Sequence, residues 1–410
     1  MMSKEKRRVP KLRFPGFTED WEQRKLGECM NSFAYGLNAA AKEYDGMHKY
    51  IRITDIDDET HNFIQSNLTS PDIDFNMDVS DYKLNVGDIV FARTGASVGK
   101  TYLYNPNDGD LYYAGFLIRG KVKEDCDAGF IYQNTLTKDY DSFIKITSQR
   151  SGQPGVNSKE YATFRLNIPC KDEQEQISKV LNSLDELFTL HQRKLDNLKL
   201  KKKALLQKLF PKNGERYPEL RFPGFTDTWE QRKFSDLYEK ISEKNDLSYS
   251  LDKIISVANM YYKSDAKVSN EEYLRTYNIF RYGEIAFEGN KSKNFAYGRF
   301  VENTIGDGII SHVFEVFRPI VKYDIYFWKY YINYEPIMGK VLSRCTKKTT
   351  MMTNLVAKDF LKETILVPTL AEQKQIGTLL NTLDKFITLH QRKLDHLKLQ
   401  KKALLQQMFV

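Results

Sequence analysis

One stretch of sequence occurs twice, once near the middle of the chain and once at its end. The two copies span residues 173–210 and 372–409, and their shared core reads H-Q-R-K-L-D, then L-K-L, then K-K-A-L-L-Q. An internal repeat constrains the architecture before any other feature, because each copy must form the same supersecondary unit. The repeat therefore predicts two equivalent long elements, one closing each half of the chain.

Apolar residues in each copy recur at alternating spacings of three and four, as in the seam of a coiled coil. The alternative is one buried amphipathic helix in each half, but the length and regularity favour two long helices packed on each other. A polar residue in such a seam more often sets the register of the helices than binds a metal. The predicted seam residues are Leu181, Leu184, His191, Leu195, Leu198 and Leu205 in the first copy, and Leu380, Leu383, His390, Leu394, Leu397 and Leu404 in the second.

A shorter signature opens each half. Residues 12–18 read L-R-F-P-G-F-T and are followed by W-E-Q-R-K, and both strings return from residue 220. The Pro-Gly pairs indicate tight turns, and we interpret the aromatic residues as packing anchors. The chain is therefore a tandem of signature, variable region and long helix. We predict a first domain at 1–172, its helix at 173–212, a second domain at 213–371 and its helix at 372–410.

The variable regions diverge but keep a common frame. Residues 82–91 resemble 277–287, and residues 164–169 resemble 363–368. Short β-branched and aromatic runs between Gly, Asn and Asp indicate strands. We predict the α/β (α+β) class, with two globular mixed α/β domains joined by two long helices. A matched frame with unlike inserts is what two binders of unlike targets need.

Composition restricts the classes of protein. A chain of 410 residues with 41% hydrophobic residues is large enough for two domains with cores. The net charge of +8 permits nucleic acid as a partner without proving it. The four cysteines are far apart in sequence and contain no C-x-x-C, which indicates neither a zinc site nor a disulfide framework. No signal peptide or membrane span is evident, so we expect a cytoplasmic protein with no membrane partner.

Motifs that could carry catalysis lack the context that they need. Residues 94–101 approach a P-loop, but Thr94 stands at the first glycine position and a strand-like segment follows where a helix is required. Asp72 and Asp81 loosely fit a nuclease pattern that the second half lacks. The histidines form no metal-binding pairs. We therefore predict no catalytic site, no metal and no cofactor in this chain.

Polar, basic loops occur at matching places in the two variable regions. Arg, Lys, Asn and Gln side chains can form bidentate hydrogen bonds with the edges of bases, while Ser, Thr and Lys side chains and backbone amides near glycine bind phosphates. Ordinary solvated loops are the alternative, but the repetition favours two binding domains that read separated DNA half-sites. The candidate DNA-binding residues are Arg93, Thr94, Ser97, Lys100, Arg150, Gln153 and Asn157 in the first half, and Asn290, Lys291, Lys293, Arg344, Lys347, Lys348 and Thr350 in the second.

Together, the L-R-F-P-G-F-T…W-E-Q-R-K signature and the E-Q…L-D…L-H-Q-R-K-L…K-K-A-L-L-Q-x-x-F helix resemble the specificity subunit of type I DNA restriction-modification enzymes. The resemblance covers the whole chain, in the order of two target-recognition domains and two conserved helices. It implies a non-catalytic subunit that reads a bipartite, asymmetric site in double-stranded DNA. It also implies that the two helices form an antiparallel coiled coil, which sets the spacing and docks the modification subunits.

The resemblance further implies partners and their cofactors. Two modification subunits, which are adenine methyltransferases using S-adenosylmethionine, would bind this chain. Restriction subunits, which are ATP-dependent translocases and nucleases requiring Mg²⁺, would complete the enzyme. This chain would itself hold none of these cofactors.

Two other classes of protein remain open at this point. A free-standing enzyme would hydrolyse or methylate its substrate as the purified chain alone. A coiled-coil adaptor that binds only protein would show no DNA binding even with modification subunits present.

Overall fold

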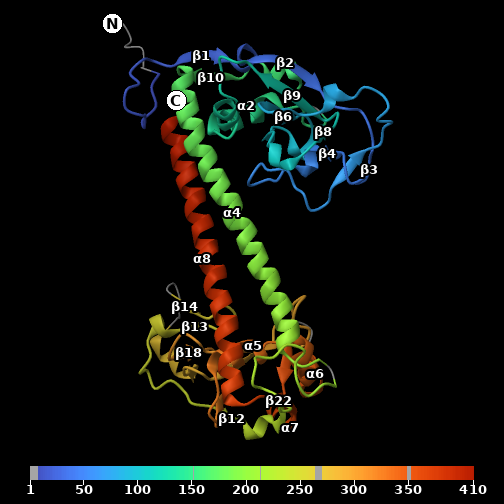
Figure 1. Cartoon of the computed structure of the whole chain (residues 1–410). Helices are drawn as coiled ribbons and strands as arrows, with labels where there is room; N and C mark the ends of the chain where they lie inside the picture. The colour runs from blue at the N-terminus through green and yellow to red at the C-terminus, as the bar shows by residue number, and fades with distance from the viewer. Residues whose placement is uncertain (1–7, 151, 213, 264–269, 349–351) are drawn as a thin grey trace. The chain divides into compact units, whose positions relative to one another are not determined.

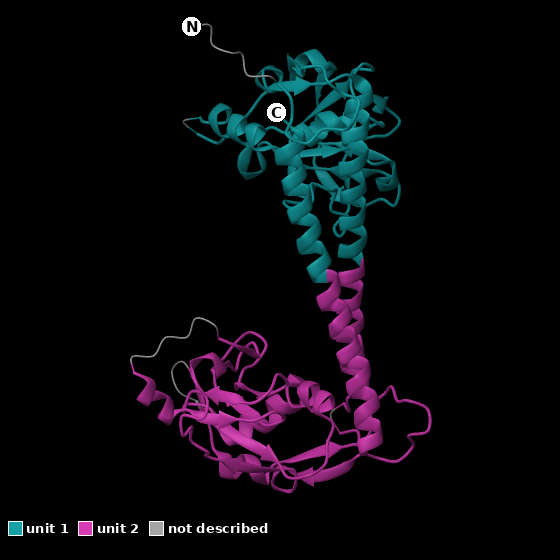
Figure 2. Cartoon of the chain, turned by 90° about the vertical axis from the view of Figure 1, so that its left-hand side faces the viewer, with its two compact units in different colours: residues 1–193, 391–410 teal, residues 194–390 magenta. Residues whose placement is uncertain are grey.

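The computed structural model describes residues 8–150, 152–212, 214–263, 270–348 and 352–410. The chain divides into two compact units, one made of residues 1–193 and 391–410 and the other of residues 194–390 (Figure 2). Each unit therefore contains one globular domain and parts of both long helices. Within the described residues, no helix is both long enough and apolar enough to cross a membrane.

The first unit is built on a four-stranded antiparallel sheet with the strand order β2-β9-β6-β7 (Figure 1). These strands are β2 (Met30–Tyr35), β9 (Leu117–Val122), β6 (Asp88–Ala92) and β7 (Thr101–Leu103). Smaller pairs join β1 (Glu22–Lys25) to β10 (Arg165–Ile168), β3 (Ala41–Glu43) to β5 (Thr69–Pro71), and β4 (Lys49–Ile51) to β8 (Leu111–Tyr113). The short helices are α1 (Ala128–Asn134), α2 (Lys138–Thr147) and α3 (Ser158–Tyr161).

The second unit repeats this frame with the order β12-β19-β16-β17. These strands are β12 (Tyr238–Ile241), β19 (Glu315–Pro319), β16 (Ile285–Glu288) and β17 (Arg299–Glu302). The smaller pairs are β11 (Glu230–Lys233) with β22 (Thr364–Val367), β13 (Ile255–Ser256) with β14 (Tyr261–Tyr262), β15 (Asn278–Phe280) with β18 (Gly308–Ile310), and β20 (Thr346–Lys348) with β21 (Thr353–Leu355). The short helices are α5 (Ile325–Tyr331), α6 (Glu335–Cys345) and α7 (Ala357–Lys362).

The two copies of the long repeat form α4 (Lys171–Leu209) and α8 (Leu370–Met408) (Figure 1). Helix α4 contains neither proline nor glycine, and a proline lies two residues beyond its last residue, where the chain can no longer continue the helix. The first turn of α4 contains Asp172 and Glu173 and that of α8 contains Glu372, and the positive end of the helix dipole stabilises such acidic side chains. The predicted mixed α/β class with two long helices is confirmed.

Both helices pass through both units. In the first unit, Asp185 of α4 pairs with Lys401 of α8, and in the second unit Lys202 of α4 pairs with Asp384 of α8, both at 2.6 Å. In the first unit, Ile177, near the start of α4, lies in the same core cluster as Met408, at the end of α8. In the second unit, Leu209, at the end of α4, lies in the same core cluster as Ile376, near the start of α8. Residue numbers thus rise along one helix as they fall along the other, so the helices are antiparallel within each unit.

The core of each globular domain is completed by the end of the helix that belongs to the other repeat. In the first unit, Trp21 and Phe130 share a cluster with Met408 of α8. In the second unit, Trp229 shares a cluster with Leu209 and with Phe210, which follows α4. Each unit therefore draws on both helices, and the domain boundaries predicted along the sequence stay a prediction.

Candidate nucleic-acid interface

The repeated arginine of each signature holds the start of a long helix. The guanidinium of Arg13 donates two hydrogen bonds of 2.8 Å to the carboxylate of Glu173, in the first turn of α4. Arg221 and Glu372 repeat the arrangement at 2.8 and 2.7 Å. Both carboxylates are fully buried. A buried ion pair thus joins each signature to the start of a long helix. Only the aromatic residues of the signature were interpreted from the sequence, as packing anchors.

The glutamine after each of these glutamates joins the helix to the rest of its domain. In the first unit, Gln174 accepts a hydrogen bond from the backbone N–H of Asp127 and donates one to the carbonyl of Pro169, both at 2.9 Å. Gln373 makes the equivalent two bonds at 3.1 Å. Since Asp127 is the N-cap of α1, the repeated E-Q pair positions a short helix of the domain as well as the signature.

The end of each long helix is anchored among aromatic rings. Phe409 stacks on Phe130 with ring centroids 5.3 Å apart and meets the edge of Trp21 at 6.4 Å. Phe210 contacts Tyr331 at 4.9 Å in the other unit. Such aromatic pairs stabilise by roughly 0.5–1.5 kcal/mol beyond the burial of their area. The repeated sequences therefore form the frame, which leaves the segments between them to form the surface that varies.

Two of the predicted loops in the first unit lie against each other. The N–H of Val156 donates to the carbonyl of Arg93 at 2.9 Å, and the N–H of Gly95 donates to the carbonyl of Pro154 at 3.0 Å. Gly95 has a φ of +71°, a backbone conformation that favours glycine. The exposed side chain of Gln153 lies beside this glycine, with its amide nitrogen 3.0 Å from where a Cβ would stand. The backbone thus brings together residues 93–95 and 154–156.

The side chains of these loops differ in how they are held. The guanidinium of Arg93 lies over the ring of Tyr35 at 5.0 Å. Two other basic residues form ion pairs, Lys100 with Asp58 and Arg150 with Glu160. The side chain of Asn157 caps α3, and the hydroxyl of Thr94 donates a long hydrogen bond to the carbonyl of Pro154. Ser97 is buried. Their assignment as DNA contacts stays a prediction. Gln153 is exposed, and Arg93 is half-buried against Tyr35.

The predicted loops of the second unit also meet through backbone contacts. Asn290 forms a bridge with Met352, and the N–H of Thr353 donates to the carbonyl of Gly289 at 2.9 Å. The side chains of Asn290, Lys291, Lys293 and Lys347 are exposed, whereas Arg344 is paired with Glu363. The side chain of Lys348 and the whole of Thr350 lie outside the described residues. Residues 289–290 and 352–353 therefore occupy the place that residues 93–95 and 154–156 occupy in the first unit.

An acidic residue after a left-handed glycine organises the sheet beside each pair of loops. Asp88 and Glu284 follow Gly87 and Gly283, whose φ values are +89° and +86°. Each carboxylate accepts a hydrogen bond from the backbone N–H three residues earlier, at 2.9 and 2.7 Å. Burial raises the pKa of both carboxyl groups. The sequence predicted a turn followed by a strand at residues 82–91 and 277–287, and the structure has that turn before β6 and β16.

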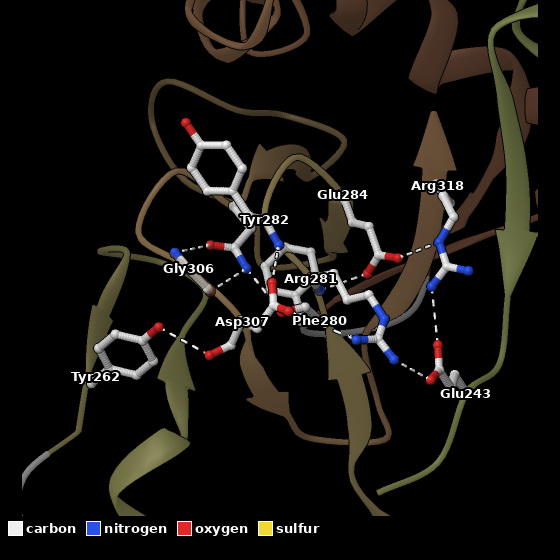
Figure 3. A network of polar contacts seen from close by, with 10 residues as sticks. Glu243, Tyr262, Phe280, Arg281, Tyr282, Glu284, Gly306, Asp307 and Arg318 are labelled. Carbon is white, nitrogen blue, oxygen red and sulfur yellow. Dashed lines mark hydrogen bonds and ion pairs between the residues drawn. The ribbon is translucent and has the colours of Figure 1, made fainter. Parts of the chain in front are cut away.

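In the second unit this turn extends into a network of ion pairs (Figure 3). Arg318 donates to Glu284 at 2.7 Å and to Glu243 at 3.0 Å, and Arg281 also pairs with Glu243. Asp307 accepts from the backbone N–H of Tyr282 at 2.8 Å. Sequence reasoning missed this network because its members are far apart along the chain. It connects β19, through Arg318, to the turn before β16 in the sheet that carries the loops.

Glu302 in β17 is a buried acid of a different kind. Neither of its carboxyl oxygens has a hydrogen-bond partner among the described residues, and the nearby hydroxyl of Tyr323 donates instead to Gly283 at 2.7 Å. Burial, reinforced by the negative charge of Asp324, raises its pKa well above the ordinary value, and Lys329 opposes the shift. The neutral acid is therefore the form that the fold stabilises.

A cleft of about 1160 Å³ lies within the first unit, between the domain and both helices. Three of the lysines that line it pair with acids, Lys401 with Asp185, Lys100 with Asp58, and Lys398 with Glu59. Four further basic residues also line it, which are Lys138, Lys145, Arg165 and Lys402. Among the described residues there is no group of His, Cys, Asp and Glu that could hold a metal ion.

This arrangement is matched by known proteins. The family model of the type I restriction modification DNA specificity domain matches residues 18–200 and again residues 226–399, so the chain belongs to this family. Each match covers one variable region and most of the helix that follows it. The repeat read from the sequence is thus a repeat of the family's own domain.

Individual relatives are specificity subunits. The chain is 25% identical over 198 residues to a putative type I restriction enzyme MjaX specificity subunit of Methanocaldococcus jannaschii, covering 47% of this chain and 46% of the relative. It is 21% identical over 239 residues to the MjaVIII specificity subunit of the same organism, covering 57% and 52%. The chain spans about half the length of these curated relatives. The S subunit of a type I restriction-modification system from M. genitalium has the same fold, with a TM-score of 0.67, 13% identity and 98% and 99% coverage.

Proposed function

We propose that this chain is the DNA-binding specificity subunit of a type I restriction-modification complex, with each globular domain reading one half of a bipartite DNA site. The observation that carries the proposal is that the DNA specificity family model matches the chain twice, once for each variable region and its helix. The frame around the loops is the same in both units, whereas the loop residues differ. Equal frames with unlike loops suit two unlike half-sites.

The long helices are the proposed spacer and docking site. Leu187, Leu190 and Leu200 of α4 are exposed, and so are the residues at the same positions of the repeat in α8, which are Phe386, Leu389 and Leu399. Exposed apolar residues that recur at the same positions of both helices suggest contact with a partner. Because the exposed residues recur in both copies of the repeat, they fit two copies of one partner. We infer that these partners are two modification subunits.

In this assignment the chain is non-catalytic. S-adenosylmethionine would act in the modification subunits, and ATP and Mg²⁺ in the restriction subunits. The contribution of this chain is to bind double-stranded DNA at a chosen sequence and to hold the methyltransferases there.

An exchange of one variable region tests the reading assignment. Residues 22–172 would be replaced by the corresponding region of another family member, and the methylated DNA of cells carrying the complex would be sequenced. We expect one half of the recognised sequence to change and the other half and the spacer to stay. Changes in both halves, or an unchanged sequence, would contradict independent domains. A complex that contains modification subunits but binds no DNA would favour the protein adaptor.

A pair of equivalent substitutions tests the docking assignment. Leu200→Asp and Leu399→Asp each place a charge on one copy of the exposed apolar surface, and Asn197→Asp is the control at an exposed polar position of α4. We expect each leucine variant to bind one modification subunit less tightly, which the mass of the purified complex would show. If both variants assemble as the control does, the partners bind elsewhere.

A further inference from the structure

One exposed apolar side chain stands at the same turn in each domain. Phe116 lies between β8 and β9 with 58% of its surface exposed, and Val313 lies between β18 and β19 with 61% exposed. The strand registers make them equivalent. The pair Ala92–Leu117 places Phe116 opposite Arg93, and the pair Phe287–Glu315 places Val313 opposite Gly289. Arg93 and Gly289 occupy the same position after the repeated G-[DE]-I turn.

The backbone around Phe116 is tightly held. Its carbonyl accepts a hydrogen bond of 3.0 Å from the N–H of Arg93, and the N–H of Gly115 donates to Leu37 at 2.8 Å. At Gly36, an added Cβ would lie 2.2 Å from the carbonyl oxygen of Ala114, so these two segments approach as closely as glycine allows. The ring is thus presented to solvent from a rigid base. A rigid exposed ring loses little conformational freedom when it binds a partner.

The turn is next to the predicted reading loops. Arg93 bonds Phe116 through its N–H and Val156 through its carbonyl, so its backbone lies between the turn and the loop that carries Gln153. In the second unit, Gly289 bonds Thr353 and is followed by the exposed Asn290. Each apolar side chain therefore lies beside polar or cationic groups suited to a nucleic acid. An apolar side chain cannot form a hydrogen bond or an ion pair with a phosphate, but it can contact the methyl group of thymine in the major groove.

We propose that Phe116 and Val313 are specificity-determining residues, each contacting the C5-methyl group of a thymine in the half-site that its own domain reads. This inference rests on the proposed function, since it requires that the two loop surfaces face DNA. It adds an apolar contact to the hydrogen-bonding residues expected from the sequence.

The test uses the complex of the full chain with its modification subunits and a duplex containing its methylated sequence. Each thymine of the site is replaced in turn by deoxyuracil, which removes only the methyl group. For the wild-type complex we expect about fourfold weaker binding at one thymine in each half-site, which corresponds to the roughly 0.8 kcal/mol of one buried methyl group. Phe116→Ala should remove this sensitivity in the first half-site only, and Val313→Ala in the second only.

Val86→Ala is the matched control, because Val86 is an exposed apolar residue of the same domain that precedes β6, at the opposite end of that strand from Arg93. It should leave the whole pattern unchanged. Phe116→Gln, which keeps much of the side-chain volume without the ring, should act as Phe116→Ala does, and thermal unfolding checks that both variants are folded.

Sequence-specific binding without sensitivity to any deoxyuracil, or with a sensitivity that Phe116→Ala preserves, would overturn the inference and leave the proposed function standing. If the wild-type complex shows no preference for its methylated sequence over unrelated DNA, the proposed function itself fails.

Discussion

Removal of the arginine from one clamp tests what connects the signature to the long helix. Arg13→Met keeps most of the apolar stem and removes the charge that faces Glu173, whose side chain is 0% exposed. Breaking a buried ion pair by removing one partner costs about 3–5 kcal/mol, because the other charge stays buried without compensation. Glu173 lies in the first turn of α4, where the helix dipole offsets about 1 kcal/mol of that cost. We therefore expect a loss of roughly 2–4 kcal/mol.

The assay is calorimetric unfolding of the wild type and the variant at neutral pH. For a unit of about this size, 1 kcal/mol lowers the Tm by about 2–4 °C, so the first unit should unfold roughly 4–16 °C earlier. Arg221→Met should produce the same change in the second unit. A double variant, Arg13→Met with Glu173→Gln, should recover part of the loss because no buried charge remains.

The matched control is Arg24→Met in the same unit. Arg24 pairs with Glu22 at 2.7 Å and with Asp125 at 3.2 Å, but both acids are mostly exposed. Surface pairs of this kind contribute at most about 1 kcal/mol. If Arg13→Met lowers the unfolding temperature no more than Arg24→Met does, the buried clamp does not hold the helix as argued.

Three other changes have defined outcomes. Leu195→Ala should cost about 2–5 kcal/mol in urea unfolding because Leu195 is buried, while Leu200→Ala, at an exposed position of the same helix, should cost far less; equal losses would contradict a seam at Leu195. Glu302→Leu should gain stability relative to the wild type as the pH rises above 4.5, the ordinary pKa of a glutamate. Because the pKa of Glu302 is raised in the folded state, the wild type keeps its full stability below pH 4.5 and loses stability as the pH rises toward the folded-state pKa. A stability difference that does not change with pH would show that Glu302 does not titrate in this way. Gln153→Ala should relax one base of the first half-site at a cost of roughly 1–3 kcal/mol, whereas Lys347→Ala should weaken all sequences evenly and lower the salt slope by about one unit; binding to single-base variants across salt concentrations separates the two.

The sequence predicted the parts of the fold that depend on local pattern. The heptad spacing predicted both long helices, because an apolar seam is written along one continuous segment. The residues after the P-loop-like segment were predicted to form a strand, and they form β7. Asn157 was predicted only as a DNA contact, and the structure shows that its side chain also caps α3, with Glu160 completing the capping box.

The contacts that join distant segments could not be read from the sequence. The acids that hold Arg150 and Arg344 lie ten and nineteen residues away, and no periodicity connects them to their partners. Cys29 and Cys126 are far apart in sequence, yet their thiols interact in the first unit, where the hydrogen bond between them and then burial raise the pKa of Cys29. Side-chain partners of loop residues are set by tertiary packing, which is why candidate DNA contacts were harder to select than helices.

Each long helix has an aspartate at the same position of the repeat, and each aspartate accepts hydrogen bonds from a different domain. The carboxylate of Asp185 in α4 accepts hydrogen bonds from Lys401 at 2.6 Å and from the side-chain amide of Gln133, in α1, at 3.0 Å. Asp384 of α8 takes Lys202 at 2.6 Å and the hydroxyl of Tyr330, from α5, at 2.5 Å. The aspartate and lysine belong to the repeat, while the third group is a different residue type in each domain. Each domain is thus held through groups that lie in its frame and outside its loops, so the loops can change without altering how the domain is held. This separation gives a physical reason why a specificity subunit could acquire a new half-site while keeping its frame.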